Sequence, residues 1–186
     1  IVIEVLVPDF LDKDESLQKV LDAWPEIFNH NMETVRRLTP QVRSRAAYDR
    51  SLSVLRKVKE RGVGIIHTKS GIMLGLGETE EELFETMRDL RNARCDILTL
   101  GQYLQPSLCH LPVAEYISPE KFDEYGEVAR EMGFMHVASG PMVRSSYHAD
   151  EFKLPHSGDN FYADEFKLPH PGDNFFKLGT GKSFQA

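Results

Sequence analysis

The sequence lacks several features that would assign it to a class of protein. It has only two cysteines, Cys95 and Cys109, and no Cys-x-x-C pair, so we expect no cysteine-based metal site from this chain alone. No apolar run reaches the roughly 20 residues of a membrane-spanning helix. The net charge of −7 argues against general nucleic-acid binding, which needs a basic face. No basic segment precedes the apolar run that begins at Ile1, so we interpret that run as an internal strand exposed by truncation, not as a signal peptide.

The composition that remains is ordinary for a globular protein. Of 186 residues, 41% are hydrophobic and 27% are charged, which is enough to build the core of one domain. Strand patterns alternate with helix patterns along the chain. We expect strands at 1–7, at 27–29, from residue 65, at 96–100 and at 134–138, and helices at 17–24, at 45–61, from residue 79 and from residue 118. Such repeated βα units form either an open doubly wound sheet or a barrel.

Polar clusters follow three consecutive strands of this pattern. They lie at residues 29–34, 69–78 and 102–105. Polar side chains clustered at one rim, where the strands end, are typical of a barrel. The sequence therefore favours a (β/α) barrel over an open sheet.

The stretch from residue 67 to residue 78 combines a strand with a glycine-rich turn. Gly71, Gly75 and Gly77 fall within it, and Thr79 and Glu82 then form a capping box that begins a helix. Glycines at the end of a strand let a ligand approach the backbone. Taken alone, the pattern fits a structural turn as well as it fits a ligand site.

The character of the sequence changes after residue 150. Residues 149–161 and 163–175 are near-identical copies that differ only at Ser157 and Pro171. The segment is rich in Pro, Gly, Asp and Asn and has no helix or strand period. We interpret residues 151–186 as an irregular or disordered tail made by local duplication, and residues 1–150 as the folded domain.

Seven stretches of the chain form an ordered set of motifs that together cover residues 1 to about 150. They are IEVLVPDF (3–10), FNHNMETV (28–35), TKSGIMLGLGET (68–79), LTLGQYLQPS (98–107), HLPV (110–113), YISPEKF (116–122) and VRSSYHA (143–149). In this order they resemble the motifs of lipoyl synthase, a radical S-adenosylmethionine enzyme.

The resemblance implies a fold, a reaction and its cofactors. The fold is a partial (β/α) radical-SAM barrel in which this chain supplies the third strand onward. The family inserts two sulfur atoms at C6 and C8 of an octanoyl chain held on a lipoyl-carrier protein. It uses S-adenosylmethionine and two 4Fe-4S clusters, one to cleave S-adenosylmethionine to a radical and an auxiliary one that is consumed as the sulfur donor.

The resemblance also implies partners and a location. The partners would be the octanoylated carrier protein or lipoyl domain and a reductant such as ferredoxin or flavodoxin, with no nucleic acid and no membrane. The location would be the cytoplasm for a bacterial protein, and the mitochondrion or plastid for a eukaryotic one.

Site residues follow from the matching motifs. Gly71, Met73, Gly75 and Glu78 match the GxIxGxxE pattern that lies along the adenine of S-adenosylmethionine. Small residues there would let the backbone meet a flat ring.

Three polar residues complete the expected cofactor site. Asn31 and Glu33 match polar family positions and are expected near the ribose or the methionyl group, although a satisfied loop network would use the same residues. Gln105 is a weaker candidate of the same kind.

A serine oxygen is the family's fourth ligand to the auxiliary cluster. The resemblance places it on Ser146, with Ser145 as the alternative. Without the resemblance, two adjacent serines would indicate a capping or turn site.

The chain departs from the family pattern in two places. The two cysteine triplets, CxxxxCxxxxxC and CxxxCxxC, are absent, and Leu108 and Cys109 stand where many relatives have basic residues. We therefore expect the isolated chain to be inactive, as a fragment of a lipoyl synthase. A non-catalytic remnant that binds or packs against a partner is the alternative.

Deleting residues 152–186 is expected to leave the thermal stability of the domain almost unchanged, because the tail has no apolar period with which to pack. Thermal denaturation of the truncated and the complete chain measures this. A loss of several kcal/mol on truncation would show that the tail packs onto the domain.

Overall fold

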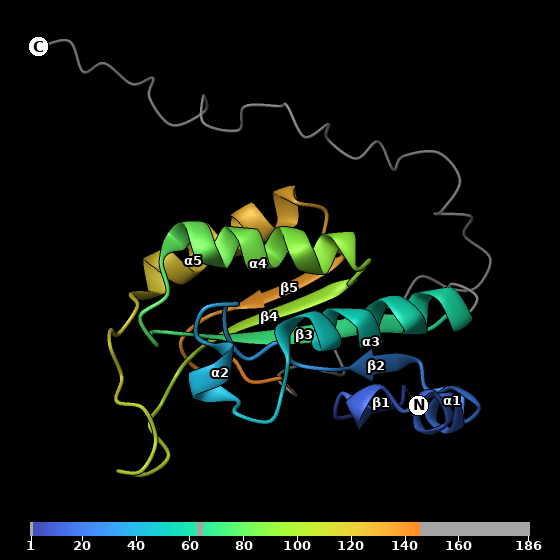
Figure 1. Cartoon of the computed structure of the whole chain (residues 1–186). Coiled ribbons are helices and arrows are strands. Elements are labelled where there is room, and N and C mark those ends of the chain that lie inside the picture. The colour runs from blue at the N-terminus through green and yellow to red at the C-terminus, as the bar shows by residue number, and fades with distance from the viewer. Residues whose placement is uncertain (1, 63–64, 146–186) are drawn as a thin grey trace, which may run out of the picture. The chain divides into compact units, whose positions relative to one another are not determined.

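Five parallel strands form one sheet whose order in space is their order in the chain (Figure 1). The computed structural model describes residues 2–62 and 65–145. The strands are β1 (Glu4–Leu6), β2 (Ile27–Asn29), β3 (His67–Leu74), β4 (Ile97–Gln102) and β5 (His136–Ser139). An open doubly wound sheet would reverse its strand order at a switch point. Because this order never reverses, the predicted partial (β/α) barrel is confirmed.

The helices follow the strands, as the sequence predicts, with two additions and with the first helix shifted three residues toward the N-terminus. They are η1 (Phe10–Asp12), α1 (Asp14–Leu21), α2 (Thr39–Val42), α3 (Tyr48–Arg61), α4 (Glu80–Asn92) and α5 (Pro119–Glu131). The prediction missed η1 and α2, each a single turn too short to show a helical period, and it placed the first helix at 17–24. The capping box that begins α4 is confirmed: Thr79 Oγ1 accepts from Glu82 N at 3.3 Å, and Glu82 Oε2 accepts from Thr79 N at 2.9 Å.

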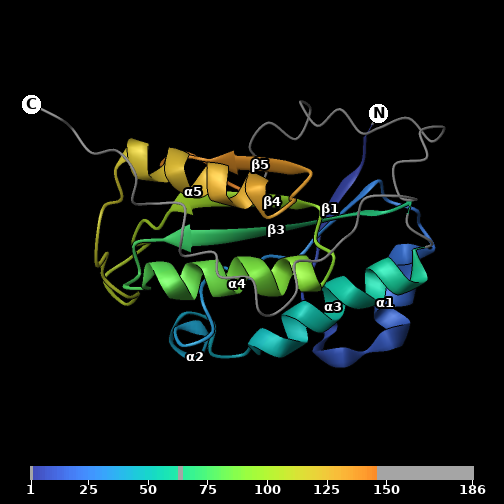
Figure 2. The same ribbon diagram turned by 90° about the horizontal axis from the view of Figure 1, so that it is seen from above.

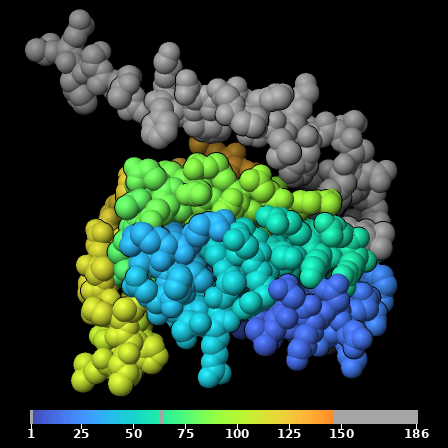
Figure 3. Space-filling view, viewed as in Figure 1, coloured from blue at the N-terminus to red at the C-terminus, as the bar shows by residue number. Residues whose placement is uncertain are grey.

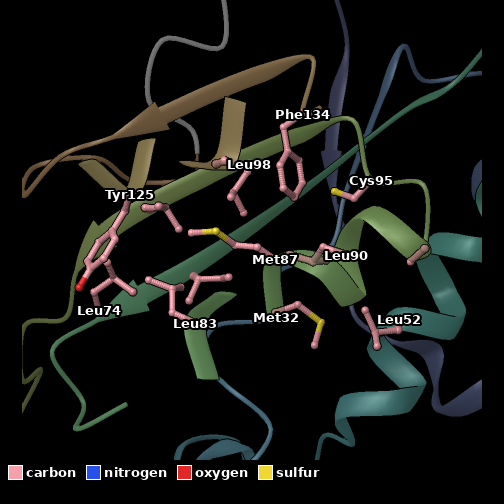
Figure 4. Close-up of a cluster of buried hydrophobic side chains, with 14 of the residues drawn as sticks. Met32, Leu52, Leu74, Leu83, Met87, Leu90, Cys95, Leu98, Tyr125 and Phe134 are labelled. Atoms are coloured by element: carbon pink, nitrogen blue, oxygen red, sulfur yellow. The ribbon is translucent and has the colours of Figure 1, made fainter. Parts of the chain in front are cut away.

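One face of the sheet is apolar and covered by helices α3, α4 and α5 (Figure 2). Leu98 of β4 points into this layer, and Met87 and Leu90 of α4 meet it from the other side (Figure 4). Leu100 of β4 belongs to the same buried cluster. Each of these four side chains is fully buried. Full burial of such a side chain stabilises the fold by roughly 1.5–3 kcal/mol, so this layer fixes which face of each strand points away from the helices.

The opposite, inner face of the sheet is polar where β1, β2 and β3 meet. Lys69 Nζ lies 2.9 Å from Glu4 Oε2, and Asn29 Nδ2 donates to Glu4 Oε1 at 2.7 Å. The side chain of Lys69 is completely buried. This ion pair spans β2 and joins the first strand to the third.

None of the helices within residues 2–62 and 65–145 is both long and apolar enough to cross a lipid bilayer.

Replacing Lys69 by Met is expected to lower the free energy of unfolding by about 3 kcal/mol, because it leaves the Glu4 carboxylate without its counter-ion on the inner face. The double variant Lys69→Met/Glu4→Leu should recover part of that loss, since neither charge then remains. Denaturant unfolding of the single and double variants measures both effects.

Lys57→Met is the matched control. Lys57 pairs with Asp14 at 2.8 Å at the surface, so its loss should change stability much less. If the Lys57 and Lys69 variants lost the same free energy of unfolding, the inner ion pair would contribute no more to stability than the surface pair.

Candidate functional site

Three residues from neighbouring strands meet on the inner face near the carboxyl ends of the sheet. Gly71 of β3 pairs in register with Thr99 of β4, and Asn31 follows β2 on the other side. A Cβ added to Gly71 would come 2.9 Å from Thr99 Oγ1 and 3.0 Å from Asn31 Oδ1. Glycine is therefore needed here for space, and the three residues form the floor of a candidate site.

The side-chain oxygen of Asn31 has no hydrogen-bond partner among the described residues, although it is buried. An unpaired buried acceptor costs about 1–3 kcal/mol, and most such groups in native proteins are satisfied. The Asn31 oxygen is thus an acceptor available to a donor from a bound molecule. The sequence reasoning proposed Asn31 and Gly71 separately, and the structure brings them together.

The main chain after β2 continues along β3 and holds Glu33 at the same rim. Glu33 N donates to Gly71 O at 2.9 Å, and Met73 N donates to Glu33 O at 2.8 Å. Glu33 adopts a left-handed backbone conformation with φ of 66°, which is uncommon for a residue other than glycine. Its side chain is half-buried beside this rim. Met73 is also half-buried and packs against a small apolar cluster that includes Val35 and Tyr103.

Arg43 also belongs to this rim, and the sequence reasoning missed it. Its Nη1 donates to Asn31 O at 3.0 Å, to Met32 O at 3.2 Å and to Ser51 Oγ at 3.3 Å. Burial lowers the pKa of the guanidinium, and the charge of Glu33 opposes that shift. The site thus has a cation and a carboxylate near Asn31. Only the fold brings Arg43 to Asn31, because no helical or strand period connects them.

The glycine turn after β3 is held in place by hydrogen bonds to the carboxylate of Glu78. Glu78 Oε1 accepts from Gly75 N at 2.6 Å, and Oε2 accepts from Leu76 N at 2.9 Å. Gly75 has a φ of +95°, and a Cβ there would overlap Glu115 O and Gln102 Nε2. The missing side chain at Gly75 therefore leaves room for the chain's own loop, whereas Gly71 forms part of the floor of the candidate site.

The remaining proposed residues lie further along the chain. Gln105 is exposed, and its Nε2 donates to His110 O at 2.8 Å within its own loop. Ser145 is half-buried and follows a segment that crosses the inner rim, since a Cβ on Gly101 would overlap Val143 O. Ser146 lies outside the described residues, as does the duplicated segment.

The two thiols are not placed to hold a metal together. Cys95 is buried in the helix-covered layer beside Phe134 and Leu90 (Figure 4), and burial raises the pKa of its thiol to about 12. Cys109 is exposed in the loop between β4 and α5. Within residues 2–62 and 65–145, no group of three or more His, Cys, Asp or Glu side chains is placed to bind a metal ion. The described residues do not fit an iron–sulfur cluster.

Comparison with known proteins agrees with the resemblance. The profile of the Radical SAM superfamily matches residues 1–90. The lipoyl synthase of Flavobacterium psychrophilum is 59% identical over 152 residues, which are 82% of this chain and 52% of that protein. The lipoyl synthase of Caldanaerobacter subterraneus subsp. tengcongensis is 57% identical over 150 residues, or 81% of this chain and 52% of that protein.

The same relationship extends to a eukaryote. A protein of Nematostella vectensis named "Lipoyl synthase, mitochondrial" is 55% identical over 149 residues, which are 80% of this chain and 50% of that protein. The chain spans about half the length of the curated relatives it matches. On these matches, the chain belongs to the radical S-adenosylmethionine superfamily and, within it, to the lipoyl synthase family.

Proposed function

We propose that the protein containing this chain is a lipoyl synthase, which inserts two sulfur atoms at C6 and C8 of an octanoyl chain carried on a protein. Identity of 55–59% to proteins of that name over about four fifths of the chain supports the proposal. The observation that carries it further is the unpaired Asn31 oxygen facing Gly71 at the carboxyl ends of parallel strands. Ligands of α/β barrels bind at that rim.

S-adenosylmethionine fits the donors and acceptors of this rim. Its ribose hydroxyls and adenine amino group are donors for which the Asn31 oxygen is an acceptor. Glu33 would accept a hydrogen bond from a hydroxyl or ammonium group, and Arg43 would neutralise the carboxylate of the methionyl group. When bound, S-adenosylmethionine supplies the radical chemistry after which the superfamily is named.

The residues of the GxIxGxxE pattern would hold the adenine in two ways. Gly71 and Met73 would lie along the ring, because neither places a branched side chain on the inner face. Gly75 and Glu78 would act through the shape of the turn, which their backbone and carboxylate hydrogen bonds define.

The thiolate ligands of the 4Fe-4S clusters would come from outside these 186 residues, which carry only two cysteines. Ser146, or Ser145 in its place, would supply one oxygen to the auxiliary cluster. The same shortage of thiols favours the alternative function, a non-catalytic remnant that binds or packs against a partner.

The partners belong to the proposal as well. They are an octanoylated lipoyl-carrier protein or lipoyl domain and a reductant of the ferredoxin or flavodoxin type. The compartment would be the bacterial cytoplasm, or the mitochondrion or plastid in a eukaryote.

A protein in which a cysteine-containing upstream region is joined to this chain is expected to convert octanoyl-carrier protein to the lipoyl form. The assay supplies S-adenosylmethionine and a reductant and measures deoxyadenosine and lipoyl product by mass spectrometry. Asn31→Ala should raise the KM for S-adenosylmethionine by about tenfold or more, since it removes the buried acceptor. Asn92→Ala, at the exposed end of α4, is the matched control. Deoxyadenosine without lipoyl product under any condition would assign the protein to another member of the superfamily.

The isolated chain is expected not to hold a 4Fe-4S cluster. A site-differentiated cluster needs three protein thiolates, and the chain offers one buried and one exposed cysteine. Anaerobic reconstitution with iron and sulfide, followed by absorbance and electron paramagnetic resonance, measures the cluster content. A stoichiometric, reducible four-iron cluster on these 186 residues would contradict the ligand count.

A further inference from the structure

Gln102, the last residue of β4, is a buried amide whose hydrogen bonds all go to one loop. Its Nε2 donates to Tyr103 O at 3.1 Å and to Glu115 O at 3.0 Å, and its Oε1 accepts from Ile117 N at 3.0 Å. Only 5% of the residue is exposed. We name residues 103–118 the β4–α5 loop; it projects from the body of the protein (Figures 1 and 3). The Gln102 amide joins the two ends of this loop.

The same loop is bonded to the glycine turn. Ala114 N donates to Gly75 O at 2.9 Å, and Glu115 N donates to the same oxygen at 3.3 Å. A Cβ on Gly75 would overlap both Glu115 O and Gln102 Nε2. The amide, the loop and the turn therefore touch at one point, with Gln102 between the other two.

The turn is thus held from two sides. The Glu78 carboxylate binds Gly75 N and Leu76 N within the turn, and the loop binds Gly75 O from outside. Gly75 with φ of +95° has no side chain of its own to fix this conformation, and glycine loses the most conformational freedom when it is ordered. Without the outer contact, part of the binding free energy of a ligand on this turn would go into ordering it.

We propose that Gln102 is a positioning residue for the S-adenosylmethionine site, acting through Glu115 and the β4–α5 loop to fix the Gly75 turn. This rests on the proposed function, which places the adenine along Gly71 and Met73, directly before that turn. Gln102 itself does not need to touch the cofactor. The nearby Gln105 does not share this role, because it is exposed and bonded to His110 O.

A purely structural role for the Gln102 amide would give a different experimental result. If Gln102 only satisfied buried backbone groups, its loss would reduce the folded fraction, and the folded molecules would keep their affinity. If it positions the turn, folded molecules would bind S-adenosylmethionine more weakly but turn it over at nearly the same rate once bound.

Two substitutions of similar size separate these cases. Gln102→Met removes all three hydrogen bonds. Gln102→Glu keeps the acceptor for Ile117 N but sets a carboxylate against the carbonyl oxygens of Tyr103 and Glu115. A buried carboxylate without a counter-ion lowers the folded fraction in either case, so the two variants are compared by KM per folded molecule. A role in holding those carbonyls predicts a higher KM for Glu than for Met, whereas a purely structural role predicts the wild-type KM for both.

The experiment uses the full-length, cluster-loaded protein at pH 8, with kcat and KM for S-adenosylmethionine measured from deoxyadenosine formation and the folded fraction from circular dichroism. Gln102→Met is expected to raise KM about tenfold with kcat per folded molecule within twofold, and Gln102→Glu to raise KM further. Gln18→Glu, at an exposed position on α1, controls for the added charge; it breaks only a surface hydrogen bond to Asp22 Oδ1, so its KM should match that of the wild type.

The outcomes separate the inference from the function beneath it. An unchanged KM in both Gln102 variants, or a loss confined to the folded fraction, overturns the positioning role while the wild-type activity stands. A wild-type protein that neither binds nor cleaves S-adenosylmethionine overturns the proposed function, and the positioning role with it.

Discussion

The packing of one face of the parallel sheet against helices α3, α4 and α5 is the constraint on which the rest of the structure depends. Side chains alternate between the two faces of a strand, so the apolar residues Leu98 and Leu100 of β4 decide where Thr99 points. The same holds on β3, where Ile72 and Leu74 face the helices and Gly71 faces inward. A shift of one residue in register would exchange the two sets and destroy both the core and the site.

The inner face is organised in successive polar rows along the strands. Glu4, Asn29 and Lys69 form one row, in which the charges are paired and the Lys69 side chain is completely buried, while Asn29 Oδ1 has no hydrogen-bond partner among the described residues. Asn31, Gly71 and Thr99 form the next row toward the carboxyl rim, in which the Asn31 oxygen has no partner among the described residues. The first row can stabilise the barrel because its charges are neutralised within it. The second row holds no ion pair, and its unpaired Asn31 acceptor lies nearer the carboxyl ends of the strands, where ligands of α/β barrels bind.

Much of the fold could be predicted from the sequence, because the sequence patterns that indicate helices and strands are local. The alternation of strand and helix patterns gave the βα order, and the capping box at Thr79 and Glu82 begins α4 as predicted. The capping box is read within four residues of chain, and the helices show their period over three or more turns. The polar clusters after three consecutive strands favoured a barrel, and the observed strand order agrees with it.

The candidate site could be predicted only in part from the sequence, because its contacts join residues that are distant in the chain. Asn31 and Gly71 were proposed from motifs, but nothing local shows that Arg43 donates to Asn31 O or that Thr99 lies against Gly71. In the GQYLQP stretch the sequence pointed to Gln105, and Gln102 is the buried one. Two glutamines three residues apart cannot be ranked by pattern when the chain between them leaves a strand. Burial of Gln102 depends on the return of the loop at Glu115, thirteen residues later.

The glycine pattern after β3 therefore combines two different physical tasks. Gly71 is glycine because Thr99 and Asn31 occupy the space of a side chain, and its φ is ordinary. Gly75 is glycine because of both its positive φ and the close approach of the β4–α5 loop. Glu78 completes the second task by closing the turn on its own backbone amides. This motif of similar-looking glycines thus contains a position on the floor of the candidate site, Gly71, followed by a turn that the Glu78 carboxylate holds by hydrogen bonds.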